Sequence, residues 1–462
     1  MFSSTRMRIS HYARIAGISL TLLFLLSTSL FLNVPTTMAR SAQHIGALSS
    51  YGHWTKWNTN SAPTDTACRA TYDVPCYSPQ EIRQAYNLSA LVNHGDAGKG
   101  QTIVIIDSFG SPTAYADLKK FDADYGIPDP PSFKQLAPLG SVAFDPTNDQ
   151  QLGWAEETSL DIQWSHALAP AANIVVLTSP VSETEGVTGM PEFLKLEQYA
   201  VNNHIGKIIS QSWSATENTF FDAAGEKVLS QFEQFYQYAA SQHVSVFASA
   251  GDSGSANVDV NGNTYPFPTV GYPASSPWVT AVGGTSLYAD TSGNYQSETA
   301  WNDGVGSATG GGISQYFKEP FYQRLTLPKQ TQKLLNGHRA IPDISMNADP
   351  NTPVPVYLGF LGGVNNGYYL FGGTSESSPL WAGLTADANQ YVGHPLGFLN
   401  PILYGLGANK LTGTRVFHDI TVGNNAQGTI PGYQATPGWD ATTGWGSPDA
   451  QPLFSALRLL TF

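Results

Sequence analysis

The sequence predicts an α/β fold with a mostly parallel sheet and helices on both faces. Apolar runs rich in β-branched residues alternate with segments whose apolar residues recur at helical spacing. That alternation is typical of parallel strands joined by helical crossovers. No Pro/Ser-rich linker and no internal repeat interrupts it, so residues 78–462 are expected to form one domain.

Five runs are the expected strands, and four segments between them are the expected helices. The strands are TIVIID (102–107), NIVVL (173–177), KIIS (207–210), VSVFASA (244–250) and WVTAVGG (278–284). The helices are TAYADLKKFDADYG, WAEETSLDIQWSHALA, PEFLKLEQYAVNNH and VLSQFEQFYQYAASQH. The Gly-rich region 283–312 and the tail beyond residue 395 are expected to be loops.

The first 39 residues have the pattern of a secretory signal peptide. Arginines precede an apolar stretch over residues 15–32, and small residues surround Ala39, after which cleavage is expected. A membrane anchor is the alternative, but serines and threonines interrupt the stretch. We therefore expect a secreted, extracellular protein, free of the membrane after signal removal, in which residues 40–77 form a short pro-segment or an N-terminal extension.

The composition limits the binding partners and the working pH that we expect for this protein. Lys and Arg number 22 against 35 Asp and Glu, a formal net charge of −13, so nucleic acid is not an expected partner. Charged residues make up only 12%, about half the usual share of roughly 25%. Such a surface suits acid pH, because few ion pairs are lost as carboxylates protonate. In an exported chain Cys68 and Cys76 are expected to form a disulfide rather than two free thiols.

Ser375 is the candidate nucleophile. Gly372 and Gly373 permit a tight turn before it, and Ser378 with Pro379 is expected to cap and begin a helix. A serine in front of that helix faces the positive end of its dipole, which favours a developing negative charge. The alternative is that the hydroxyl residues of this segment only cap the helix.

Histidine is not the expected base. Subtilisin-like enzymes with a histidine base carry a His-Gly-Thr-His stretch after their first strand, and no such stretch follows VIIDSFG here. His166 lies at a helix end and His243 lies before a strand, so both are interpreted as structural. A histidine-based subtilisin-like peptidase is therefore disfavoured.

Two acids are the better candidates for the base. Glu157 and Asp161 are four residues apart and so share a helix face, which also carries Leu160 and Trp164. Carboxylates on an apolar stripe must share protons or bind a cation, and burial raises their pKa values. The pair therefore suits an acid-tuned general base, whereas Glu156 is expected on a solvated face.

Asp252 is the third candidate acid. It follows a predicted strand in the Gly-rich turn FASAGDSGS, and ligands of such sheets bind at the carboxyl ends of strands. A protonated Asp there can donate a hydrogen bond to an oxyanion. An ordinary turn residue is the alternative.

Together these stretches resemble the sedolisin family of serine-carboxyl peptidases, relatives of subtilisin in which a carboxylate replaces histidine. The family's Glu-x-x-x-Asp helix is matched by Glu157 and Asp161, its SAGDSG turn by residues 249–254, and its Gly-Thr-Ser-x-x-x-Pro by residues 373–379. Further similar stretches are SPQEIRQAYNL, SQSWS, YPASSPWVTAVGGT, GGGISQYF and RAIPDISMNADP.

The resemblance implies that Ser375 is the nucleophile, Glu157 the base and later acid, Asp161 its hydrogen-bonded support and Asp252 the oxyanion-hole acid. It implies a monomer that cleaves protein or peptide substrates at acid pH as an endopeptidase, with tripeptidyl-peptidase activity as the alternative. A binding or scaffold protein with a dead site is disfavoured, because all four positions hold a chemically competent residue.

The resemblance also implies one calcium ion. Its ligands would be the side chains of Asp419 and Asp440 and the backbone oxygens of Ile420, Thr436 and Gly438. Hard oxygen ligands suit calcium rather than zinc, and without the resemblance these segments are plain turns.

Two features depart from the family pattern. Only residues 40–77 stand where relatives carry a long prodomain, which makes zymogen control doubtful. Ser214 stands where many relatives have glycine, and a narrower substrate subsite is expected there.

Overall fold

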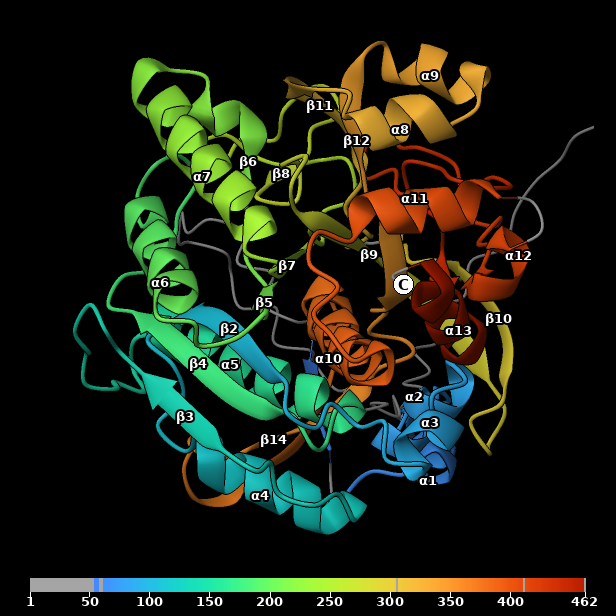
Figure 1. Ribbon diagram of the computed structural model, residues 1–462. Helices are drawn as coiled ribbons and strands as arrows, with labels where there is room; N and C mark the ends of the chain where they lie inside the picture. The colour runs from blue at the N-terminus through green and yellow to red at the C-terminus, as the bar shows by residue number, and fades with distance from the viewer. Residues whose placement is uncertain (1–53, 58–60, 305, 410–411, 461–462) are drawn as a thin grey trace, which may run out of the picture. The chain divides into compact units, whose positions relative to one another are not determined.

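The computed structural model of the chain describes residues 54–57, 61–304, 306–409 and 412–460 (Figure 1). The predicted signal peptide, residues 1–39, lies outside this part of the chain. Within it, no helix is both long and apolar enough to cross a membrane.

The centre of the fold is an eight-stranded sheet with the order β10-β9-β7-β5-β2-β4-β3, in which β13 also pairs with β9. All of its pairings are parallel except that of β10 with β9. Its strands are β2 (Thr102–Ser108), β3 (Phe133–Leu136), β4 (Asn173–Ser179), β5 (Ile208–Gln211), β7 (Ser245–Ser249), β9 (Thr280–Ala289), β10 (Tyr295–Ala300) and β13 (Ile344–Asn347). The predicted α/β class is confirmed.

Side-chain alternation along β2 places an apolar core on each face of the sheet. Ile103 and Ile105 join one core, whereas Val104 and Ile106 join the other. The first core is covered by α5 (Asp149–Leu168) and α10 (Thr374–Val392), and the second by α6 (Met190–Asn202) and α7 (Ala223–Ser241) (Figure 1). The two catalytic candidates Glu157 and Ser375 therefore come from helices on the same face.

Shorter elements surround this sheet. The remaining strands are β1 (Trp54–Lys56), β6 (Ala215–Thr216), β8 (Gly271–Tyr272), β11 (Gly312–Lys318), β12 (His338–Ile341), β14 (Val354–Leu358), β15 (Gly367–Phe371), β16 (Phe417–His418) and β17 (Ser447–Pro448). The remaining helices are α1 (Asp65–Tyr72), α2 (Pro79–Ala85), α3 (Ser89–Asn93), α4 (Ala114–Tyr125), α8 (Phe321–Thr326), α9 (Lys329–Leu335), α11 (Asn400–Ala408), α12 (Gly413–Val416) and α13 (Ala450–Leu460), with 3-10 turns η1 (Glu217–Phe220) and η2 (Gly363–Asn365).

The prediction that region 283–312 and the tail beyond 395 are loops was wrong. β9 runs through Gly283 and Gly284, followed by β10 and the start of β11, and the tail contains α11, α12 and α13. The glycines in β9 serve close packing, because a Cβ on Gly283 would lie 2.7 Å from Pro342, and one on Gly284 would lie 2.6 Å from Ala348. In a sequence, glycine usually indicates the end of a strand. In β9 the glycines instead mark positions where another segment packs directly against the strand backbone.

The described part of residues 40–77 belongs to the same structural unit as the rest of the domain. β1 pairs antiparallel with β15, with Trp54 opposite Phe371, shortly before the segment that carries Ser375. The predicted disulfide between Cys68 and Cys76 is present. Both cysteines are buried in the core under α5 and α10.

Candidate active site

Glu157 and Asp161 lie on α5, which begins at an Asn148 cap whose side chain accepts the backbone N–H groups of residues 150 and 151. Glu157 is 2% exposed and Asp161 0%, so the predicted burial of this pair is confirmed. The prediction that Glu156 lies on a solvated face was wrong, because Glu156 is only 7% exposed. The cause is that α5 is buried on all sides beyond its first turn and has no solvated face.

Ser375 lies in the first turn of α10 and is fully buried. The helix begins at Thr374, five residues earlier than predicted, so Ser378 is not its cap and Pro379 lies inside it. Pro379 is the sixth residue of the helix and has no N–H to donate to the carbonyl of Ser375, so the helix continues without that bond. Ser375 therefore sits at the positive end of the helix dipole, as expected, but within the helix rather than before it.

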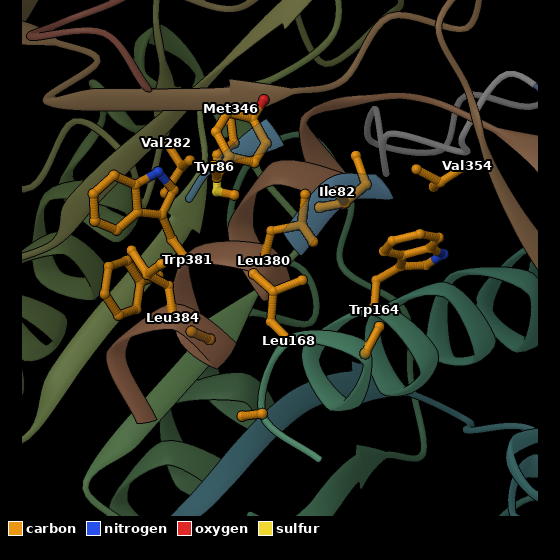
Figure 2. Packing of buried hydrophobic residues seen from close by; sticks show 14 of the residues in the cluster. Ile82, Tyr86, Trp164, Leu168, Val282, Met346, Val354, Leu380, Trp381 and Leu384 are labelled. Carbon is orange, nitrogen blue, oxygen red and sulfur yellow. The ribbon is translucent and has the colours of Figure 1, made fainter. Parts of the chain in front are cut away.

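Close packing of α5 against α10 brings Glu157 and Ser375 together. A Cβ on Gly383 would lie 2.7 Å from the backbone oxygen of Ser165 and 2.9 Å from the Cβ of Leu168, so only glycine fits at this helix contact. Figure 2 shows Leu168 of α5 beside Leu380 and Leu384 of α10 in one apolar cluster. A hydrogen bond joins Ser375 to Glu157 across this contact.

Asp252 enters the site from the turn after β7, at the carboxyl end of the sheet. Its Oδ1 accepts hydrogen bonds from the backbone nitrogen and the hydroxyl of Thr374, each 2.7 Å long. The Thr374 hydroxyl also accepts a 3.0 Å bond from the backbone nitrogen of Gly251. These bonds tie the acid-bearing turn to the residue preceding Ser375.

Two carboxyl groups of this site, those of Glu157 and Asp161, are shifted towards their protonated forms. Burial raises the pKa of Glu157 well above its usual range, the adjacent Asp161 adds to the rise, and the bond with Ser375 opposes it. Burial likewise raises the pKa of Asp161, Asp107 adds to the rise, and a bond from Ser212 opposes it. No hydrogen bond between Glu157 and Asp161 is found among the described residues, so this pair interacts through charge.

Asp107 is a fifth member of this group that the sequence interpretation missed. It lies near the end of β2, is fully buried, and interacts electrostatically with both Glu157 and Asp161. Burial raises the pKa of Asp107 to about 7. The signal available in the sequence was an acid at the end of the apolar run TIVIID, where side chains face the ligand edge of the sheet.

The histidines named above lie in structural settings. His166 is buried, with its Nε2 3.3 Å from Asp122 and 3.0 Å from the backbone oxygen of Pro128. His243 occupies a left-handed turn with φ +56° just before β7. Ser214 is buried and faces Gly271 of β8, where an added Cβ would lie 3.1 Å from its hydroxyl oxygen.

The two segments with the expected calcium ligands lie next to each other. The backbone nitrogen of Gly438 donates to both carboxylate oxygens of Asp419, at 3.1 and 2.9 Å, and Asp440 accepts a 2.8 Å bond from the nitrogen of Thr436. Burial raises the pKa of Asp440 to about 7 and also raises that of Asp419. No ion pair with a basic side chain compensates either acid among the described residues, so the donor set fits a hard cation.

The described residues hold no cluster of three or more His, Cys, Asp or Glu side chains that would bind a metal by themselves. A cation at Asp419 and Asp440 would therefore depend on backbone oxygens such as those of Ile420, Thr436 and Gly438. Calcium accepts such carbonyl ligands readily, whereas zinc prefers nitrogen and sulfur.

Comparison with known proteins gives a consistent set of relatives. Residues 140–399 match the model of the subtilase family. The chain is 36% identical over 390 residues to kumamolisin from Bacillus sp. (strain MN-32), covering 82% of this chain and 63% of that protein. It is 32% identical over 393 residues to sedolisin from Pseudomonas sp. (strain 101), covering 83% and 61%.

The solved structure of Pseudomonas sedolisin, described as a serine-carboxyl proteinase complexed with two molecules of pseudo-iodotyrostatin, superposes with a TM-score of 0.70. The match has 29% identity and covers 84% of this chain and all of that one. A lanthipeptide protease at 14% identity and a TM-score of 0.51 shares the fold alone. The chain spans 63% and 61% of the lengths of the two curated relatives above.

Proposed function

The chain belongs to the sedolisin family within the subtilases, and from this we propose that it is a serine-carboxyl peptidase that hydrolyses peptide bonds through an acyl-enzyme on Ser375. The observation that carries the proposal is the hydrogen bond between Ser375 and Glu157 at a buried helix contact. A hydroxyl needs an adjacent base to become a nucleophile, and the carboxyl group of Glu157 is in contact with the Ser375 hydroxyl.

In the first half of the reaction, the Ser375 oxygen attacks the peptide carbonyl while Glu157 takes the hydroxyl proton. Glu157 then gives that proton to the leaving amine as the peptide C–N bond breaks, which leaves the acyl-enzyme. In the second half, Glu157 takes a proton from water and the water oxygen attacks the acyl carbon. The bond between that carbon and the Ser375 oxygen then breaks, and Glu157 returns the proton to Ser375. Atoms and protons balance over the cycle.

Asp252 and the backbone nitrogen of Ser375 are the proposed donors to the oxyanion that forms in each half-reaction. Asp252 must be protonated to donate, so the mechanism requires acid pH. Its hydrogen bonds to Thr374 support this role, because they hold the carboxyl group beside the first turn of α10. The nearby buried acids also favour protonated forms.

We further propose that the protein is secreted, acts as a monomer, and cleaves protein or peptide substrates as an endopeptidase. Tripeptidyl-peptidase activity is the second candidate, because a relative from Aspergillus fumigatus that is 29% identical over 435 residues is named tripeptidyl-peptidase sed4. The two activities differ in their products, since a tripeptidyl-peptidase releases fragments of uniform length from one end.

A calcium ion held by Asp419, Ile420, Thr436, Gly438 and Asp440 is the proposed cofactor. The bonds from Gly438 to Asp419 support it, because they bring the two ligand segments together. A bound cation would stabilise the buried carboxylate of Asp440 and the exposed carboxylate of Asp419, neither of which pairs with a basic side chain among the described residues. Its role is therefore structural, and no step of the reaction uses it.

The deciding experiment is digestion of an unstructured protein across the pH range, with fragments measured by mass spectrometry. We expect hydrolysis at acid pH by the wild type and none by Ser375→Ala. Glu157→Gln is expected to lower kcat by about 100-fold to 10,000-fold. Glu156→Gln is the matched control, an adjacent buried acid outside the proposed machinery, and is expected to retain activity.

Absence of hydrolysis by the wild type at every pH would identify a binding protein with a dead site. Equal activity of Glu157→Gln and Glu156→Gln would reject Glu157 as the base.

A further inference from the structure

Ser212 stands between the proposed acid pair and the nucleophile. It follows β5 directly, is fully buried, and lies under the first turn of α10. Its Oγ is 2.8 Å from Oδ1 of Asp161 and 3.4 Å from the backbone oxygen of Ser375. One hydroxyl thus faces two acceptors, one on each of the helices that form the site.

The contact with the Ser375 backbone has a cause in the sequence of α10. In an α-helix the carbonyl of residue 375 normally accepts the N–H of residue 379. Residue 379 is proline and has no N–H, so that helical bond cannot form. Ser212 approaches this same carbonyl from the neighbouring strand and offers a hydroxyl donor in place of the missing amide.

Ser212 has a single proton to donate, so its two contacts compete. The 2.8 Å distance is that of a normal O–H···O bond and the 3.4 Å distance is long, which assigns the proton to Asp161 in the arrangement seen. When Asp161 is ionised, it takes this proton as an acceptor. When Asp161 is itself protonated, it can donate to the Ser212 oxygen, and the Ser212 proton turns to the carbonyl of Ser375.

We propose that Ser212 is a positioning residue that couples the proton on Asp161 to the backbone of the nucleophile. The protonated form of Asp161 gives the first turn of α10 an additional hydrogen bond, and the ionised form removes it. No proton is gained or lost at Ser212 itself. The inference rests on the proposed function and adds a reason why Asp161 matters although no hydrogen bond links it to Glu157 within the described structure.

In the described part of the chain, the titratable groups that act on the acids of this Asp161–Ser212 relay are themselves acids. Asp107 from β2 raises the pKa of Asp161, and Asp161, Asp107 and Asp252 raise the pKa of Glu157. Burial and the negative charge of Asp107 therefore both favour the protonated form of Asp161. The relay is therefore set towards the arrangement in which Ser212 holds the Ser375 carbonyl at acid pH.

The test compares Ser212→Ala with Ser210→Ala. Ser210 is the matched control, because it is also buried, lies on β5 two residues earlier, and contacts α10 through a 3.2 Å bond to Ser378 without touching an acid. We expect Ser212→Ala to lower kcat about 10-fold to 100-fold with little change in KM, as a misplaced nucleophile would. The pH profile of kcat/KM should also move to higher pH, since losing a donor raises the pKa of Asp161.

A second substitution separates the two contacts of Ser212. Pro379→Ala restores the helical N–H to the Ser375 carbonyl. In the Ser212→Ala background it should recover part of kcat while leaving the shifted pH profile unchanged. Ser212→Cys, which keeps the shape with a weaker donor, should fall between the wild type and Ser212→Ala, and it replaces the alanine variant if that variant does not fold.

An active wild type whose Ser212→Ala and Ser210→Ala variants have the same kcat and pH profile would overturn this inference and leave the proposed function intact. A wild type that hydrolyses no peptide would instead overturn the proposed function. Failure of Pro379→Ala to recover any kcat would show that the carbonyl contact has no role.

Discussion

Asp252 accepts two hydrogen bonds of 2.7 Å on one carboxylate oxygen, both from Thr374. The backbone nitrogen and the hydroxyl of one residue thus fix the acid in orientation as well as in position. Because Thr374 begins α10, these bonds fix the proposed oxyanion acid, which lies in the turn after β7, against the helix that carries the proposed nucleophile. Any change at residue 252 must keep an acceptor on that oxygen to preserve this geometry.

Asp252→Asn should separate the donor role of this residue from its titration. Asparagine keeps one oxygen for Thr374 and presents an N–H₂ donor that does not ionise. We expect measurable activity in Asp252→Asn and a weaker decline of kcat/KM towards neutral pH than in the wild type. Asp252→Ala should lose about 100-fold to 1,000-fold in kcat at acid pH, where the wild-type carboxyl group is the proposed donor. If the asparagine variant is as inactive as the alanine variant throughout, Asp252 has another role.

Gly383→Ala should damage the site from a distance by separating α5 from α10. The added methyl group would meet the backbone oxygen of Ser165 at 2.7 Å, so the helices must move apart and the contact between Glu157 and Ser375 must lengthen. We expect a loss of about 1–3 kcal/mol in the free energy of unfolding and a lower kcat.

The matched control for that substitution is Gly405→Ala in α11. An added Cβ at Gly405 would have no atom within 4 Å. Removing a helical glycine there should raise the free energy of unfolding by about 0.5–1 kcal/mol. Chemical denaturation of both variants checks the pair, and equal effects would contradict the packing argument.

The folded protein should be more stable at acid than at neutral pH. Burial raises the pKa of Asp107 and of Glu185 to about 7, from ordinary values of 3.8 and 4.5. Between those values the folded state binds more protons than the unfolded state, so stability falls as pH rises. Each such group contributes about 1.4 kcal/mol per pH unit over that interval.

The measurement is the Tm from pH 4 to pH 8 at constant calcium. Glu185→Gln should flatten the decline, because glutamine does not titrate. A Tm that increases steadily towards neutral pH would contradict the raised pKa values of Asp107 and Glu185.

Removal of calcium should destabilise the fold. Ligand at 100 times its Kd stabilises a protein by about 2.7 kcal/mol, so chelator should lower the Tm by several degrees, and added calcium should restore it. Asp440→Asn should abolish this response, because the substitution removes the charge of one proposed ligand. Identical melting curves with and without chelator would reject the site at Asp419 and Asp440.

The sequence by itself determined the fold class, five of the eight strands of the central sheet, and the candidate acids Glu157, Asp161 and Asp252. These depend on local patterns: β-branched runs, helical spacing, and the four-residue separation that places Glu157 and Asp161 on one helix face. The start of α10, the burial of Glu156 and the membership of Asp107 were decided by tertiary structure. Residues 107, 157, 252 and 375 lie on separate elements, and no local periodicity reports which elements pack together.

The wrong prediction of a loop at Gly283 and Gly284 has the same origin. Like Gly383, each of these glycines marks a place where another segment approaches within van der Waals contact. Only the packed structure shows which atom fills the space that a side chain would occupy. Local chemistry therefore selected the candidate residues, and long-range packing decided which of them touch and which proton states they prefer.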